Sequence, residues 1–326
     1  MNKILQTAAC VALAGAVLAP LAVSAQPGGD WPSRPLRIEV GSAPGGGTDA
    51  MARAVADRLG PLLKQPVVVE NRPGVSNTIA ADFTAKSTDG HTMVMGVVTA
   101  HAIAPHLLKL GYDTNKDLVP VAFVGGVPNV LVVTNDLPAK NVQELVALAK
   151  KEPGKINYAS SGAGSTQHIA AEMFRDATGV DIVHVPYKGS GPALMDIVGG
   201  QVQMSFDTMP SAIGQIKAGK MRALAVTTPK RNPQLPHVPT MAESGLPQVE
   251  VTAWYGIYMP AATPKAVQQR VHDEVNKVLA LPETKTRLEA IGAEVTPMTQ
   301  AEFIAFNNAE FKRYGDLIRK ANIKVD

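Results

Sequence analysis

Short apolar runs alternate with periodic apolar stripes along most of this chain. The runs are rich in β-branched residues and are bounded by Gly, Pro or polar residues, a pattern that predicts strands. The predicted strands are Leu36–Val40, Val67–Val69, Met93–Val98, Val121–Val124, Val130–Val133, Ile182–Val185, Met204–Phe206, Ala223–Val226 and Gly256–Met259. Helical patterns separate them, so we expect an α/β fold of parallel sheets with helices on both faces.

Several helices carry start signals as well as an apolar stripe. Apolar residues recur every four positions over Thr48–Leu63, which predicts a helix with one buried face. Asn141 and Glu144 have the spacing of a capping box before another helix. The last predicted helix follows Thr299–Glu302, and we expect it to bury Phe303 and Phe306.

Three glycine-rich loops each stand between an apolar strand and the start of a helix. They are Ala43–Asp49, Ser160–Thr166 and Lys188–Pro192. The first turn of a helix has unpaired backbone N–H groups and roughly half a positive charge, so it attracts anions. The loops therefore predict a cleft that holds an anion.

The first 25 residues have the pattern of an export signal. Lys3 supplies a positive start, Ala8–Val23 is almost wholly apolar, and Val23-Ser24-Ala25 fits the small-residue cleavage rule. The run is shorter than the ~20 residues that a membrane span needs. We expect a signal peptide over residues 1–25, cleaved near Ala25, and a soluble periplasmic chain.

Composition narrows the function classes. Cys10 is the only cysteine and lies in the signal, so cleavage leaves no disulfide, thiol nucleophile or cysteine–zinc site. The net charge is +3, the basic residues are scattered and 5% of residues are aromatic, which argues against a nucleic-acid partner. The seven histidines show no metal-ligand spacing, and we expect no metal and no cofactor.

An exported α/β enzyme stays open as the alternative function. Gly45, Gly47 and Ala50 match a dinucleotide-binding G-x-G-x-x-A pattern, and Glu70 ends the next strand. The export signal removes the chain from the cytoplasmic NAD pool, which counts against that interpretation. For a hydrolase, Ser165 and His168 could form a nucleophile pair, but no G-x-S-x-G, H-E-x-x-H or P-loop motif is present.

Turn-rich segments mark two crossings between domains. At Gly125–Asn129 the chain leaves a first domain, and at Leu246–Val249 it returns. We therefore predict a first lobe over 26–126 plus 251–326 and a second lobe over 127–250. Two crossings predict a hinge between the lobes.

The order of the motifs resembles one known family. The motifs are Trp31-Pro32, Pro44–Asp49, Glu70–Gly74, Asn157–Ser165 followed by His168, Val185–Gly189, Gly219–Val226 and Val238–Thr240. Together, from Trp31 to the C-terminus, they resemble the Bug family of periplasmic solute receptors, the binding components of tripartite tricarboxylate transporters.

The resemblance implies a type II periplasmic binding protein, with two doubly wound α/β lobes joined by two crossing strands. It implies a monomeric receptor rather than an enzyme, with a small mono-, di- or aromatic carboxylate as ligand and transporter membrane subunits as partners. Backbone N–H groups and hydroxyls would hold the carboxylate. The implied ligand-binding residues are Gly45, Gly46, Gly47, Thr48, Asp49, Thr99 and His101 in the first lobe and Ser160, Gly164, Ser165, Thr166, His168 and Asp207 in the second.

One segment departs from the family pattern. After Asn71–Gly74 the family continues with more glycine, whereas this chain has Val75-Ser76-Asn77. We expect the side chains of Val75 and Asn77 to narrow the rim of the pocket or to change its polarity. The departure bears on the identity of the ligand rather than on the fold.

Overall fold

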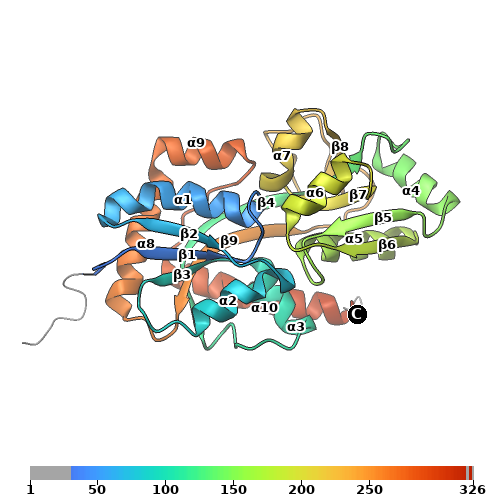
Figure 1. The fold of residues 1–326 in the computed structure, drawn as a ribbon. Helices are drawn as coiled ribbons and strands as arrows, with labels where there is room; N and C mark the ends of the chain where they lie inside the picture. Colours follow the sequence, from blue (N-terminus) through green and yellow to red (C-terminus); the bar gives the residue numbers. More distant parts are fainter. Residues whose placement is uncertain (1–30, 321–322, 325–326) are drawn as a thin grey trace, which may run out of the picture.

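The protein is described by a computed structural model that covers residues 31–320 and 323–324. The predicted signal peptide and Cys10 lie outside the described residues. Two lobes follow one another along the long axis of the molecule, and each is a β-sheet with helices packed on it (Figure 1). The prediction of a two-lobed α/β fold is confirmed.

The sheet of the first lobe has the strand order β2-β1-β3-β9-β4. Its strands are β1 (Leu36–Val40), β2 (Val67–Asn71), β3 (Thr92–Val97), β9 (Thr252–Pro260) and the first part of β4 (Leu118–Thr134). The helices of this lobe are α1 (Gly47–Leu63), α2 (Thr78–Ala85), α3 (Ala104–Leu107), α8 (Lys265–Ala280), α9 (Pro282–Ala290) and α10 (Gln300–Lys320). In Figure 1, α1 and α9 lie above the sheet and α2, α3 and α10 lie below it.

The second lobe is built around the remaining part of β4. That part pairs with β7 (Met204–Thr208) on one side and β8 (Met221–Val226) on the other, and β5 (Ile156–Ser160) and β6 (Ile182–Pro186) extend the sheet beyond β7. Four helices cover it: α4 (Val142–Lys151), α5 (Thr166–Thr178), α6 (Ser190–Val198) and α7 (Met209–Lys217).

Strand β4 corrects two predictions. The runs Val121–Val124 and Val130–Val133 are not separate strands but parts of one strand of 17 residues that passes through both sheets. The sheets are also mixed rather than wholly parallel, because β4 runs antiparallel to β9, β7 and β8, and β9 runs antiparallel to β3. The physical reason is that one crossing strand leaves the first lobe and the other returns to it, so the two must run in opposite directions.

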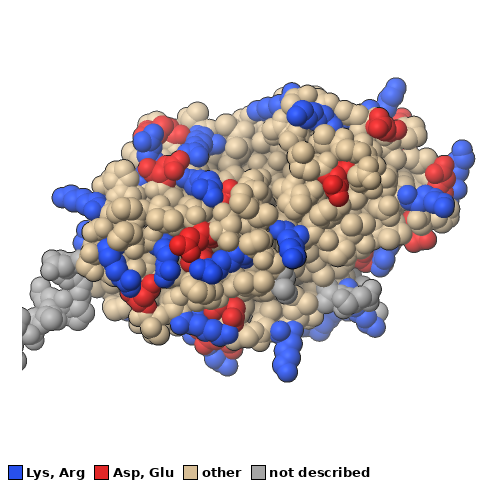
Figure 2. All heavy atoms as spheres, viewed as in Figure 1, with Lys and Arg blue, Asp and Glu red and all other residues tan. Residues whose placement is uncertain are grey.

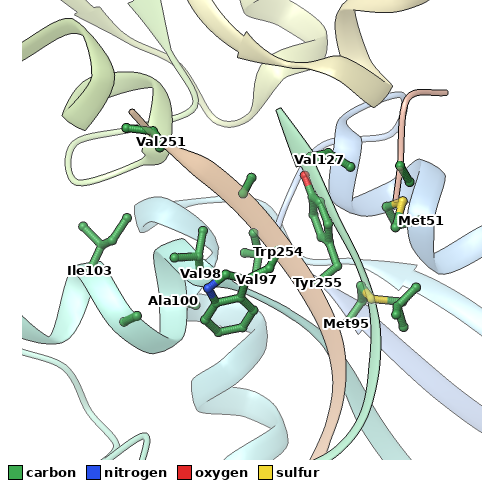
Figure 3. Close-up of a cluster of buried hydrophobic side chains, with 14 of the residues drawn as sticks. Met51, Met95, Val97, Val98, Ala100, Ile103, Val127, Val251, Trp254 and Tyr255 are labelled. Atoms are coloured by element: carbon green, nitrogen blue, oxygen red, sulfur yellow. The ribbon is translucent and has the colours of Figure 1, made fainter. Parts of the chain in front are cut away.

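Successive side chains of the crossing strands pack into hydrophobic cores on opposite faces of the sheet. Leu131 and Val133 belong to a core that includes α4 and α5, whereas Val130 and Val132 belong to a core with α6 and α7. Successive strand residues point to opposite faces, so both faces of this strand are buried. Trp254 and Tyr255 likewise lie on opposite sides of β9 (Figure 3).

The predicted start of α4 and the predicted buried face of α10 can be compared with the structure. Asn141 caps α4, and its side chain accepts a hydrogen bond of 2.8 Å from the Glu144 backbone N–H. Phe303 is fully buried against Phe123, as expected, but Phe306 is only half-buried. The sequence pattern identified the buried face of α10 but overestimated its width.

Two glycine-to-alanine variants should change stability in opposite directions. A Cβ at Gly256 would overlap the Phe303 ring and lie 3.0 Å from the Ala122 carbonyl oxygen, so Gly256→Ala should lower the free energy of unfolding by about 1–3 kcal/mol. A Cβ at Gly214, inside α7, would meet nothing within 4 Å, so Gly214→Ala should raise it by about 0.4–1 kcal/mol. Urea denaturation of both variants checks this, and equal midpoints would contradict it.

Candidate functional site

Six strand-to-helix junctions meet where the two lobes face each other. Strands β1, β2 and β3 lead towards α1, α2 and a π-helical turn at Thr99–Ile103, and β5, β6 and β7 lead into α5, α6 and α7. Between these junctions lies a cavity of ≈ 20 Å³. Its lining consists of Ser42, Gly47, Thr48, Asn77, Val97, Thr99 and Tyr255 from the first lobe and Ser161, Thr166, Gln167, Ser190 and Thr208 from the second.

The lining carries hydroxyls, amides and backbone N–H groups but no charged side chain. Five helices of eight or more residues begin at these positions. Gly47, Thr166 and Ser190 are the first residues of α1, α5 and α6, while Asn77 and Thr208 are the N-caps of α2 and α7. The positive ends of five helix dipoles therefore point at one small volume, which suits an anion.

Four of the thirteen residues proposed from the sequence line the cavity: Gly47, Thr48, Thr99 and Thr166. The other nine are not part of the lining, and several of them hold the surrounding loops in place. Gly46 is the N-cap of α1, and Ser165 is the N-cap of α5, accepting the His168 backbone N–H at 3.3 Å. Gly45 precedes the cap and has a positive φ of 81°.

Asp49 does not line the cavity but holds the first loop. Its carboxylate accepts hydrogen bonds from the Gly45 backbone N–H at 3.0 Å and Asn71 Nδ2 at 2.9 Å, and it pairs with Arg53 at 2.9 Å. Burial alone would raise the pKa of Asp49, but the hydrogen bonds from Arg53, Asn71 and Gly45 outweigh it and hold the pKa below its usual range. Asp49 is thus an ionised brace that shapes the loop.

Two imidazoles hold the second loop from behind. His184 Nε2 lies 2.6 Å from Ser160 Oγ, and His168 Nδ1 accepts the Gly164 backbone N–H at 3.0 Å. The rings of His168 and His184 are stacked with centroids 4.4 Å apart. Ser160 is fully buried. The two histidines contact the loop at Ser160 and at Gly164, and these contacts hold the loop that leads into α5.

This arrangement bears on the proposed Ser165–His168 nucleophile pair. Ser165 Oγ accepts the backbone N–H of His168, while Nδ1 of that imidazole accepts from Gly164 instead. A general base must reach the hydroxyl that it activates, and Ser165 Oγ is here occupied as a helix cap. The geometry supports a structural role for both residues.

His101, predicted to bind the ligand, is not among the residues that line the cavity. It is fully buried, its ring stacks on Tyr258 with centroids 3.8 Å apart, and Nδ1 lies 2.8 Å from Thr114 Oγ1. Burial lowers the pKa of His101 to about 3, so the ring is neutral. Its neighbour Thr99 lines the cavity, and His101 packs in the first-lobe core beneath it.

Asp207 lies directly behind the second-lobe wall. Its Oδ1 accepts hydrogen bonds from Ser190 Oγ at 2.6 Å, the Thr208 backbone N–H at 2.7 Å and Gln167 Nε2 at 3.4 Å. Burial raises the pKa of Asp207 to about 6, although these hydrogen bonds favour the ionised form. Asp207 thereby sets the direction of the wall hydroxyls.

Three polar atoms around the cavity lack partners among the described residues. They are Ser42 Oγ, Asn129 Oδ1 and Asp207 Oδ2, and each belongs to a side chain that is at least nine-tenths buried. Ser42 lines the cavity, and Asn129 donates to the lining residue Thr166 at 3.1 Å. A buried polar atom without a partner is costly, and of the three only Ser42 Oγ belongs to a lining residue, so a polar occupant of the cavity would supply its partner.

Seven lining residues were not predicted from the sequence, whereas Asn77 was expected at the rim of the pocket; the seven are Ser42, Val97, Ser161, Gln167, Ser190, Thr208 and Tyr255. Ser190 is the first residue of α6 and lies in the third glycine-rich loop. That loop was predicted to face an anion, but none of its residues was among the predicted ligand-binding residues. Asn77 lies in the segment that departs from the family pattern, and its Oδ1 accepts from Thr48 Oγ1 at 3.5 Å. Val97 and Tyr255 are strand residues without a local signal.

The two lobes touch directly around the cavity. Ser76 Oγ of the first lobe donates to the Ala163 carbonyl of the second. A side chain at Gly189 would come within 3.0 Å of the Ala43 backbone nitrogen across the cleft. The cavity in this arrangement has room for about one water molecule.

Three further features of the described part of the chain concern metal, membrane and charge. It holds no group of three or more His, Cys, Asp or Glu side chains that could bind a metal. None of its helices is both long and apolar enough to span a membrane. Basic and acidic residues are interspersed over the face shown in Figure 2, without a continuous patch of one sign.

Comparisons with known proteins match this chain to a family of transporter receptors and to periplasmic binding proteins. Residues 51–323 match the model of the tripartite tricarboxylate transporter family receptor. The chain is similar to the solved structure of the periplasmic binding protein BugD, with 34% identity and a TM-score of 0.87 over 90% of this chain and 99% of that one.

Two similar structures contain carboxylates. The chain is 37% identical to Rpa4515 of R. palustris with adipate, with a TM-score of 0.87 over 90% of this chain and 99% of that one. It is 31% identical to MatC of Rhodopseudomonas palustris with bound malate, with a TM-score of 0.85 over 88% and 100%.

The brace at Asp49 predicts a pH-dependent loss of stability. Because the folded-state pKa is lowered, the ionised carboxylate stabilises the fold at pH values above its ordinary pKa, and this contribution is lost as the pH falls through the folded-state pKa. Asp49→Asn should therefore cost about 1–2 kcal/mol at pH 7 and progressively less below pH about 4.

Asp113→Asn is the matched control, because Asp113 pairs with Lys116 at an exposed site. It should change stability by less than about 0.5 kcal/mol. Urea denaturation at pH 7 and pH 3 measures both variants. A cost for Asp49→Asn that is the same at both pH values would rule out the ionised brace.

Proposed function

The chain belongs to the tripartite tricarboxylate transporter receptor family, and on this basis we propose that it is an extracytoplasmic receptor for a small carboxylate. The carboxylate would bind in the cavity between the lobes and be presented to the membrane subunits of a transporter. The family and its neighbours of known structure are solute-binding receptors rather than enzymes.

The observation that carries the proposal is the uncharged cavity wall. Five helix N-termini surround a volume lined by hydroxyls and amides, with no Lys or Arg among the lining residues. Backbone N–H groups are fixed in direction, so they recognise a planar carboxylate while leaving the charge to be balanced by the helix dipoles. A neutral sugar would gain nothing from the positive ends of the helix dipoles, and these would repel an organic cation.

The small volume supports binding by lobe closure. A cavity of ≈ 20 Å³ holds about one water molecule, which is less than a mono- or dicarboxylate needs. We propose that the lobes, 26–126 plus 251–326 and 127–250, separate about the crossing strands β4 and β9 and close on the ligand. Each lobe alone contributes half of the lining, so affinity depends on the closed population.

The remaining expectations extend the same proposal. The chain would be exported by a signal peptide cleaved near Ala25 and act in the periplasm as a monomer, without cofactor or metal. Adipate and malate are the ligands found in two similar proteins, and they define the starting panel. An aromatic carboxylate belongs in the panel as well.

A thermal-shift panel tests the ligand class. At a concentration one hundred times Kd, a ligand that binds only the folded state adds about 2.7 kcal/mol, which raises Tm by roughly 4 °C for a protein of this size. Adipate, malate, succinate and benzoate are compared with glucose and putrescine. We expect at least one carboxylate to stabilise; stabilisation by the sugar or the diamine alone would overturn the proposal.

A pair of threonine variants on one helix tests the location of the site. Thr166→Ala removes a hydroxyl from the cavity wall, so affinity for the stabilising carboxylate should fall about 5–30-fold, the effect of one hydrogen bond to a charged group. Thr178→Ala, at the other end of α5, removes a hydroxyl that donates to the Phe174 carbonyl and should leave affinity unchanged. Titration calorimetry compares them, and equal affinities would place the ligand elsewhere.

A further inference from the structure

Asp207 is separated from the cavity by a single layer of side chains. Ser190, Thr208 and Gln167, which donate to its Oδ1, all line the cavity, while Asp207 itself is fully buried. Any carboxylate bound in the cavity would therefore lie close to this carboxyl group, with only the Ser190 hydroxyl or the Gln167 amide between them. Two carboxyl groups in one dry site repel each other when both are ionised.

No cation balances Asp207 among the described residues that hydrogen-bond to it. Its partners on α5 and α6 are the neutral side chains of Gln167 and Ser190, and Oδ2 has no partner at all among the described residues. The adjacent positions of β4 carry Asn129 and Val130. Tyr255 on β9 interacts with Asp207 electrostatically, and burial raises the pKa of Tyr255, so it stays a neutral phenol.

The histidine nearest in sequence to this network is directed away from it. His168 follows Gln167 on α5, but its ring stacks on His184 and its Nδ1 accepts from the Gly164 backbone N–H. The described groups around Asp207 thus include hydrogen-bond donors but no positive charge. Burial raises the pKa of Asp207 to about 6, so the free protein holds it mostly ionised at neutral pH and mostly neutral a unit below 6.

The protonation state of Asp207 decides what Ser190 offers to a ligand. With Asp207 ionised, the single hydrogen of the Ser190 hydroxyl points at Oδ1, 2.6 Å away, and Gln167 Nε2 donates to Ser190 Oγ at 3.1 Å. The hydroxyl then has no hydrogen for the cavity. A protonated Asp207 can donate to Ser190 Oγ, and the serine hydrogen becomes free to point at an anion.

We propose that this site binds its carboxylate together with one proton, which Asp207 takes from solvent as the ligand enters and which turns the Ser190 hydroxyl into a donor to the ligand. The inference rests on the proposed function and deepens it. The balance is simple: the ligand keeps its charge, Asp207 loses its charge, and the proton comes from water or buffer. The group that faces Ser190 is then a carboxylate, because an ammonium would need the ionised form of Asp207.

Proton uptake is measured on the wild-type protein with the panel carboxylate that binds best; adipate is the first choice because it has no hydroxyl or amine. Between pH 6.5 and 8 its carboxyl groups are ionised, so the charge of the ligand does not change. We expect the affinity to fall about tenfold per pH unit in this range. Calorimetry in two buffers of different ionisation enthalpy should show uptake of close to one proton at pH 7.5.

Two variants assign the proton. Asp207→Asn supplies an amide that donates without titrating, so the pH slope and the proton uptake should both disappear while binding persists. Glu39→Gln is the matched control: Glu39 is also a fully buried carboxyl whose pKa is raised by burial, but it pairs with Arg72 at 2.6 Å and does not line the cavity. This variant should keep the wild-type slope.

The outcomes are distinct. Carboxylate binding in the wild type without proton uptake overturns this inference and leaves the proposed function standing, as does a slope that persists in Asp207→Asn. If no carboxylate of the panel binds even at pH 5.5, the proposed function fails and this inference fails with it. Should Asp207→Asn not fold, the absence of proton uptake in the two-buffer measurement on the wild type would still overturn the inference.

Discussion

The antiparallel pairing of β4 with β9 is the constraint on which the rest of the molecule depends. Strand β4 pairs with β9 over Leu118–Pro128 and then, over Asn129–Thr134, with β7 and β8 of the second lobe. One continuous strand therefore links the two sheets. In an open α/β sheet, ligands bind beyond the carboxyl ends of the strands. Here those ends face each other from two sheets, so the turns of both lobes share one cavity.

The same residue type serves two opposite electrostatic purposes at these turns. Asp49, in the first turn of α1, receives hydrogen bonds from Arg53, Asn71 and a backbone N–H, which lower its pKa despite burial. Asp207, before α7, receives only neutral donors, and burial raises its pKa. The first carboxylate can brace its loop permanently, whereas the second can change its charge near neutral pH. The two sites differ in the guanidinium of Arg53 beside Asp49 and in the deeper burial of Asp207.

Glycine in these loops serves close approach between lobes as well as exposure of N–H groups. A Cβ at Gly47 would lie 2.6 Å from Thr208 Oγ1 and 2.9 Å from Tyr255 Oη, so any side chain there would hold the lobes apart. Gly189 combines a φ of 118° with the same crowding against Ala43. The glycine-rich pattern predicts an anion site because it leaves backbone N–H groups exposed. It also permits the lobes to touch, because glycine has no side chain at the points of contact.

The sequence by itself determined the elements and the turns at which the site lies. Periodicity identified β1 and α1, and loop composition identified the starts of α1, α5 and α6, because these signals are local. It could not determine that Val121–Val124 and Val130–Val133 form one strand, since pairing partners are distant in sequence. Nor could the sequence tell that the Thr166 hydroxyl lines the cavity whereas the hydroxyl of the neighbouring Ser165 caps α5. Whether a side chain faces the cavity depends on how two lobes meet, and only the tertiary structure decides that.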